Sequence, residues 1–212
     1  MTDDLIDRLS AELQPTPKRA IPRRLSMALI PGTIVSAIAM LLWLGLRPDL
    51  AEAVFGMMYW WKFLYTAIFA GLAFWAATRL ARPGGSMRRP MIALFGLIAF
   101  SGAMGIAQLI IMPPTMAYVL VMGGSALVCP FYIAALSIPI YAAIVLVMRR
   151  LAPTNLPGAG LAAGLLAGGA AAWVYAFHCT ENGMPFLAIW YTTGILISAI
   201  GGAIVGRWAL RW

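Results

Sequence analysis

The sequence predicts an all-α polytopic membrane protein with six transmembrane helices and both termini in the cytoplasm. Of its 212 residues, 62% are hydrophobic and only 10% are charged, whereas about a quarter of a typical soluble domain is charged. Six apolar runs approach the roughly 20 residues that a helix needs to cross a bilayer. The third observation is positional, because basic residues collect in alternate gaps between these runs.

The predicted spans and the basic clusters alternate along the chain. The spans are 26–46, 59–78, 91–111, 127–148, 158–177 and 187–206. The clusters are Lys18, Arg19, Arg23 and Arg24; Arg79, Arg82, Arg88 and Arg89; Arg149 and Arg150; and Arg207 and Arg211. Because positive charge marks the cytoplasmic side, the connections 47–58, 112–126 and 178–186 face outward from the membrane. The net charge of +8 follows from this topology and does not indicate direct nucleic-acid binding, since the basic residues form no continuous face.

Residues 1–24 form a cytoplasmic segment that precedes the transmembrane domain, 25–212. Leu5, Ile6, Leu9 and Leu13 fall on one face of a short predicted helix, which Pro15 and Pro17 end. The acidic residues of its first half repel anionic lipid, so this face is poorly suited to lying on the bilayer. The face therefore packs either into the groove of a protein partner or beneath the protein's own bundle.

Two stretches at the predicted outer side have distinct compositions. Tyr59, Trp60 and Trp61 beside Lys62 predict an interfacial aromatic belt with a lysine that reaches toward water. The segment 112–126 contains a proline pair and a glycine pair, which argue against a continuous helix. We expect an outer-surface or re-entrant turn there.

The last two spans carry small residues at intervals of four. Gly160, Gly164 and Gly168 lie in the fifth span. The sixth span has Gly194, Ser198, Gly202 and Gly206. This spacing lets two helix backbones approach closely in lipid. It predicts packing of the two helices within one chain, with a homodimer contact as the alternative.

The predicted span interiors carry no acid, base or cation, and the chain has no metalloprotease, phosphate-loop or haem-attachment motif. The sequence therefore predicts a protein that is not an enzyme and needs no cofactor. A small membrane carrier or channel is the alternative function, although it would require a polar path.

Two cysteines are expected at the same depth. Twenty helical residues outward from Arg149 reach Cys129, and the same count from Gly158 reaches Phe177, next to His178 and Cys179. At about 1.5 Å per residue, both thiols reach the outer rim. Three interpretations remain open: two unrelated small side chains, a disulfide, or a metal or oxidant sensor assisted by His178 or Glu181.

Three stretches resemble a known family. They are "YWWKFLYTAIFAGLAFWAATRLARPGGS", "HCTENGMPFLAIWYTTGI" and, more weakly, the N-terminal "TDDLIDRLSAEL". Together they are similar to the NrsF-type six-helix membrane anti-sigma factors of bacterial extracytoplasmic-function (ECF) sigma factors. The resemblance implies that the protein holds a sigma factor at the inner membrane and releases it under external heavy-metal or oxidative stress.

The resemblance also assigns roles to residues. The sigma-binding element would be the N-terminal segment, and its contacts would be Asp4, Leu5, Ile6, Leu9 and Leu13. The stress sensor would be Cys129 and Cys179, with His178 tuning one thiol.

Overall fold

The protein is a bundle of long helices, and its computed structural model describes residues 20–82 and 84–211. Within these residues, six helices are long and apolar enough to cross a membrane, which confirms the predicted all-α fold with six spans. They are α2 (Ala20–Trp43), α4 (Met57–Leu80), α5 (Arg88–Ile111), α7 (Cys129–Arg149), α8 (Leu156–Tyr175), and a final span in which α9 (Met184–Phe186), a π-helical turn η2 (Leu187–Tyr191) and α10 (Thr192–Ala209) are continuous.

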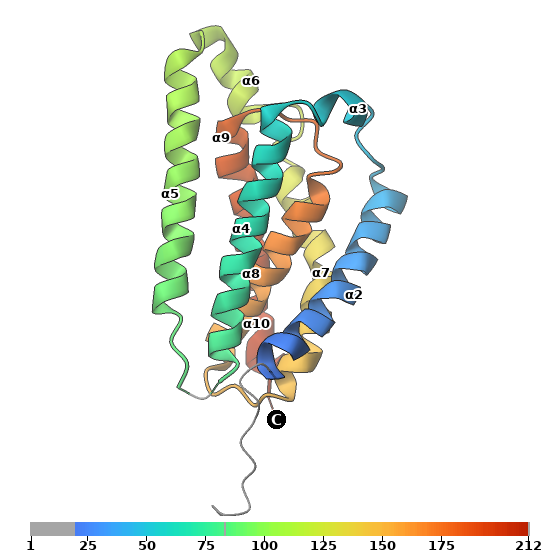
Figure 1. The fold of residues 1–212 in the computed structure, drawn as a ribbon, viewed down its shortest axis with the longest axis vertical. Helices are drawn as coiled ribbons and strands as arrows, with labels where there is room; N and C mark the ends of the chain where they lie inside the picture. Colours follow the sequence, from blue (N-terminus) through green and yellow to red (C-terminus); the bar gives the residue numbers. More distant parts are fainter. Residues whose placement is uncertain (1–19, 83, 212) are drawn as a thin grey trace, which may run out of the picture.

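Short elements connect the spans at one end of the bundle (Figure 1). Helix α3 (Leu50–Ala53) follows α2, and a single 3-10 turn (Pro114–Met116) leads into α6 (Ala117–Met122). The segment 112–126 is therefore a turn with short helices, as its proline and glycine pairs predicted. Gly123 has a φ of +51° at the end of α6, where a residue with a Cβ would be strained.

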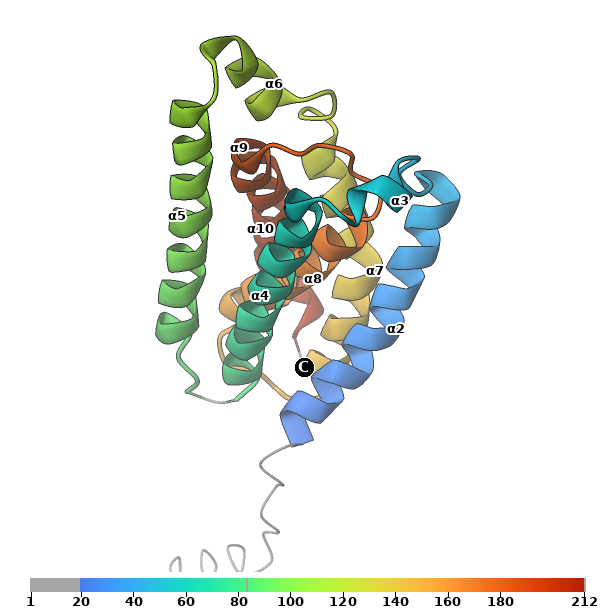
Figure 2. The same ribbon diagram turned by 45° about the horizontal axis from the view of Figure 1, so that its top comes forward.

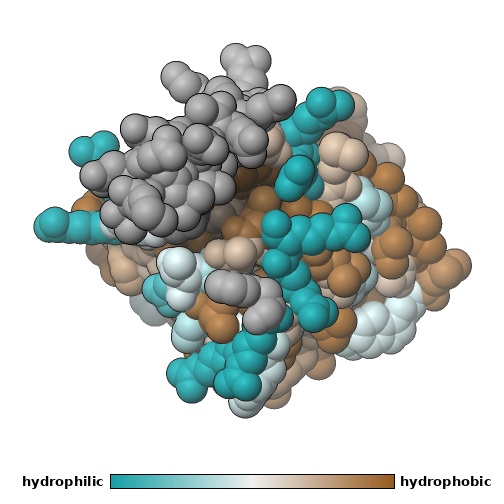
Figure 3. All heavy atoms as spheres, turned by 90° about the horizontal axis from the view of Figure 1, so that it is seen from below, coloured by the Kyte–Doolittle hydropathy of each residue, from teal (hydrophilic) through white to brown (hydrophobic). Residues whose placement is uncertain are grey.

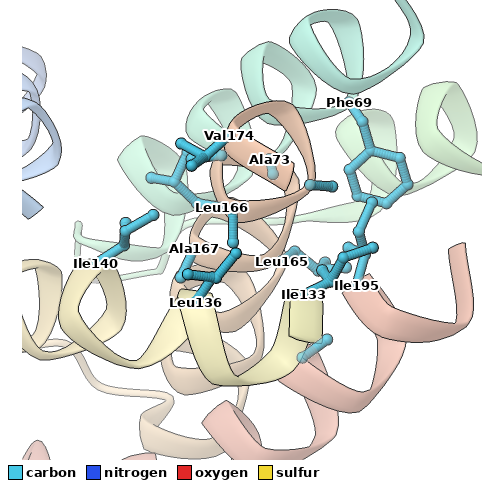
Figure 4. Packing of buried hydrophobic residues seen from close by; sticks show 14 of the residues in the cluster. Phe69, Ala73, Ile133, Leu136, Ile140, Leu165, Leu166, Ala167, Val174 and Ile195 are labelled. Carbon is cyan, nitrogen blue, oxygen red and sulfur yellow. The ribbon is translucent and has the colours of Figure 1, made fainter. Parts of the chain in front are cut away.

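Helix α8 forms the centre of the bundle, and α4, α7 and α10 pack around it (Figure 1). In its most apolar 18-residue window, 83% of the residues are buried, compared with 17% for the peripheral α5. The alanines and glycines of α8 allow this, because they bring neighbouring helices close on several sides. Larger side chains fill the remaining space. Figure 4 shows Leu165, Leu166, Ala167 and Val174 of α8 together with residues of the neighbouring helices: Phe69 and Ala73 of α4, Ile133, Leu136 and Ile140 of α7, and Ile195 of α10.

The small-residue seam joins α8 to α10 within the chain. A Cβ added to Gly206 would lie 2.7 Å from the Cα of Gly160, and one added to Gly164 would lie 2.8 Å from the Cα of Ala199. Real Cβ atoms do not approach backbone atoms so closely, so each position requires glycine. The small residues of α8 and α10 therefore pack against each other within one chain.

The two ends of the bundle differ in charge. The start of α2 and the end of α10 lie at the same end (Figure 1), as do the arginines of the predicted cytoplasmic clusters that the structure describes. We call this the basic end, and Figure 3 shows hydrophilic side chains interspersed with apolar ones on it. Cys129 begins α7 at the other end, here called the thiol end, which also holds every carboxylate of the described residues: Asp49, Glu52 and Glu181.

Candidate functional site

The candidate site is the connection between α8 and α9, residues 176–183, which crosses the thiol end of the bundle (Figure 2). We call it the 176–183 loop. It contains His178, Cys179 and Glu181. Side chains or backbone from α4, the α2–α3 connection and the α6–α7 connection hydrogen-bond to it.

Two buried cations hold the backbone of the 176–183 loop. Lys62 of α4 is 1% exposed, and its Nζ donates to the carbonyl oxygens of Cys179 (2.9 Å) and Glu181 (2.6 Å). Arg47, which follows α2, is 2% exposed, and its Nη1 donates to the same Cys179 carbonyl oxygen (3.2 Å). We call Arg47 and Lys62 the two-cation clamp. The prediction that Lys62 reaches toward water is wrong, because loop carbonyls solvate its ammonium group inside the protein.

The two cations differ in how their charge is balanced. Asp49 accepts two hydrogen bonds of 2.8 Å from the Arg47 guanidinium. This contact lowers the pKa of the Asp49 carboxyl to about 2 and raises the pKa of Arg47. The ionised carboxylate therefore favours the folded state above its ordinary pKa of about 4, and that contribution disappears as the pH falls toward 2. Lys62 makes no salt bridge to a described carboxylate.

Glu181 fastens the 176–183 loop to the α6–α7 connection. Its Oε1 accepts hydrogen bonds from the Gly124 amide (2.8 Å) and the Ser125 hydroxyl (3.1 Å). A Cβ on the neighbouring Gly123 would collide with the same carboxylate. Glu181 therefore has a structural role on the loop.

We expect Glu181→Ala to loosen this attachment. The Gly124 amide would lose its acceptor, and its hydrogen exchange is expected to accelerate by about ten-fold, since hydrogen bonds to charged groups are among the stronger ones. Exchange measured by mass spectrometry on peptides spanning 120–128 checks this. Thr180→Ala is the control, because the exposed Thr180 side chain makes no hydrogen bond to the α6–α7 connection. Equal acceleration in both variants would contradict the prediction.

The two thiols are buried beneath the 176–183 loop. Cys129 is 0% exposed and Cys179 is 2% exposed, and both are free. Tyr175 lies beside Cys129, and Tyr191 lies beside Cys179. The rings of Tyr175 and Tyr191 are 5.7 Å apart, so the aromatic pair closes the space around the thiols. A reagent from water can reach either sulfur only after a local opening.

The structure also places His178. Its Nδ1 is 3.0 Å from the carbonyl oxygen of Gly45, in the connection that follows α2. Its ring packs against Tyr175, with centroids 5.6 Å apart. Among residues 20–82 and 84–211, no group of three or more His, Cys, Asp or Glu side chains is arranged to hold a metal ion. In this conformation the imidazole therefore links the loop to the end of α2.

The predicted partner contacts Asp4, Leu5, Ile6, Leu9 and Leu13 lie outside the residues that the structure describes. Arg47 and Lys62 were not predicted as site residues, although the sequence carries a signal for them. Of the described basic residues, these two alone lie away from the basic end, where the positive-inside rule expects none.

Comparison with known proteins identifies the family. The family model "Negative regulator of sigma F", NrsF, matches residues 9–212. The chain belongs to the NrsF family. This is a family of regulators, so the prediction that the protein is not an enzyme is confirmed.

Two relatives extend over the whole chain. An "Anti-sigma-F factor NrsF" of Caulobacter vibrioides (strain NA1000 / CB15N) is 40% identical, and the match covers 100% of this chain and 99% of the relative. A "Probable anti-sigma-F factor NrsF" of Azospira oryzae (strain ATCC BAA-33 / DSM 13638 / PS) is 36% identical over the same shares. No solved structure matches the chain significantly. The resemblance noted in the sequence to the NrsF family is thereby confirmed.

Proposed function

We propose that this protein is an inner-membrane anti-sigma factor that sequesters an ECF sigma factor through its cytoplasmic N-terminal segment and releases it under external stress. The observation that carries the proposal is the family match over residues 9–212, together with relatives named as anti-sigma-F factors along the full chain. The even number of spans supports it, because it puts the two ends of the chain on one side of the membrane. The arginines at that side favour the cytoplasm.

The N-terminal segment, residues 1–24, is proposed as the sigma-binding element. Its apolar face of Leu5, Ile6, Leu9 and Leu13, preceded by Asp4, suits the groove of a protein partner. Its last residues, 20–24, belong to α2, which begins at the basic end. A sigma factor bound there would be held at the membrane and kept from RNA polymerase.

Deletion of residues 2–20 is expected to abolish co-purification of the sigma factor while the chain stays in the membrane fraction. A matched pair of substitutions sharpens the test. Leu9→Asp places a charge on the apolar face and is expected to reduce co-purification by about ten-fold or more, whereas Ala11→Asp places the same charge on the opposite face and is expected to change it less than about two-fold. Undiminished co-purification by the deleted chain would refute the proposed binding element.

We further propose that Cys129 and Cys179, with His178, receive the external signal. The thiols lie at the end opposite the basic end, which is the outer side in the proposed topology. They share that end with the hydrogen-bonded 176–183 loop. A chemical change at either sulfur would therefore disturb the hydrogen bonds of this loop. The carrier or channel alternative has less support, since buried span hydroxyls such as those of Ser36 and Thr66 donate to backbone carbonyls of the bundle.

A further inference from the structure

We infer that Arg47 and Lys62 are positioning residues of the thiol sensor: the two-cation clamp fixes the backbone at Cys179 and ties it to α2, the helix that continues into the N-terminal segment. The biological consequence of this inference rests on the proposed function. The clamp itself is a property of the contacts at the thiol end and can be tested separately.

The burial of Lys62 needs an explanation beyond packing. An ammonium group that is 1% exposed and has no carboxylate partner among the described residues is unfavourable unless hydrogen bonds replace its water. Methionine, of similar length, would fill the same space without a charge. What the lysine adds is a pair of strong hydrogen bonds to two loop carbonyls, at Cys179 and Glu181.

Both cations bind the carbonyl oxygen of Cys179, one of the two proposed sensor cysteines. Lys62 and Arg47 donate to the Cys179 carbonyl at 2.9 and 3.2 Å, so a backbone shift at Cys179 weakens both contacts at once. The thiol is 2% exposed and lies beside Tyr191. Because close-packed surroundings leave no room for an added atom or ion, modification of the sulfur displaces the backbone as well as the side chain.

Three contacts transmit such a displacement to α2. The Arg47 amide donates to the Phe177 carbonyl oxygen (3.1 Å), the Arg47 guanidinium binds Cys179, and His178 meets the Gly45 carbonyl oxygen. Gly45 and Arg47 follow the last residue of α2, Trp43, by only a few positions. Only 28% of the most apolar window of α2 is buried, so the helix is well placed to shift when its attachment at the thiol end is lost.

The test measures the reactivity of Cys179 in isolated membranes, independently of any sigma factor. In a Cys129→Ser background, Lys62→Met and Arg47→Gln are expected to raise the rate of alkylation by N-ethylmaleimide by about ten-fold or more, because each removes charged hydrogen bonds that oppose local opening. Tyr141→Phe is the control. It removes a hydrogen bond of 2.8 Å to the Gly202 carbonyl oxygen, away from the 176–183 loop, and its rate is expected to stay within about two-fold of the parent.

Rates within about two-fold of the parent in both clamp variants would overturn the inference. If Lys62→Met does not accumulate in the membrane, the rate for Arg47→Gln alone tests the inference, since Arg47 lies outside the long helices.

In a second experiment, both clamp substitutions are placed in a Cys129→Ser, Cys179→Ser background. These variants are expected to lose the sigma factor without stress, because the clamp lies between the thiols and α2 in the proposed transmission of the signal. Retention at the level of the unsubstituted protein would overturn the link to α2. If the unsubstituted protein never retains a sigma factor, the proposed function is refuted. The alkylation rates then still test whether the clamp holds Cys179.

Discussion

Replacing Gly164 with leucine is expected to remove most of the folded protein from the membrane. Even the first carbon of the new side chain would collide with the Ser198 carbonyl oxygen and lie 2.8 Å from the Cα of Ala199. Backbone atoms cannot rotate away, so α8 and α10 must separate along the seam that forms the centre of the bundle. A destabilisation of about 3 kcal/mol or more is expected from such overpacking.

The amount of protein in the membrane fraction and its unfolding midpoint in a denaturing detergent measure this effect. Gly201→Leu is the matched control, because it makes the same substitution on α10 where nothing lies within 4 Å of the added Cβ. The control is expected to accumulate like the parent. Equal loss of both variants would show that the cost arises from glycine replacement in general and not from the α8–α10 seam.

Replacing both Cys129 and Cys179 with serine is expected to abolish the stress response while leaving sigma-factor binding intact. Serine is close in size to cysteine, but its hydroxyl has neither the redox chemistry nor the metal affinity of a thiol. Induction of a sigma-dependent reporter by oxidants or heavy metals is expected to fall by about ten-fold or more, to near the unstressed level.

Two comparisons make this result interpretable. The double variant must still retain the sigma factor in unstressed cells, which separates a lost sensor from a misfolded protein. Ser125→Ala is the control at the same end of the bundle. It removes a hydrogen bond to Glu181 and leaves both thiols in place, so it is expected to respond to stress. A double cysteine variant that responds to every stress that triggers the parent would dismiss the proposed sensor.

The spans could be predicted because lipid imposes strong local rules on the sequence. Each of the six apolar runs overlaps one long helix, and the arginines of the predicted cytoplasmic clusters that the structure describes lie together at the basic end. Helix boundaries were less predictable. The first helix begins at Ala20, six residues before its predicted start, since Pro22, Arg23 and Arg24 form its first turn in addition to the apolar run. Proline is well accommodated there.

The clamp could not be predicted, because it depends on contacts between residues far apart in the chain. Lys62 and Cys179 are separated by 117 positions, and no local pattern shows that loop carbonyls will meet the ammonium group. Because Lys62 follows three aromatic residues, the sequence predicted that it belongs to an interfacial belt. That interpretation placed its ammonium group in water and not against loop carbonyls. The residue count did bring Cys129 and Cys179 to one end of the bundle, but it could not show that the 176–183 loop and two tyrosines cover them.

A stress that acts at the thiol end is expected to release a sigma factor from the basic end. The most direct measurement is the amount of sigma factor that co-purifies with the full-length chain from membranes of the same culture, before and after exposure to the inducing oxidant or metal. We predict abundant sigma factor before exposure and little after it, with no change in the amount of membrane protein. An amount that stays the same after exposure, under conditions that induce the sigma-dependent genes, would contradict release from this protein.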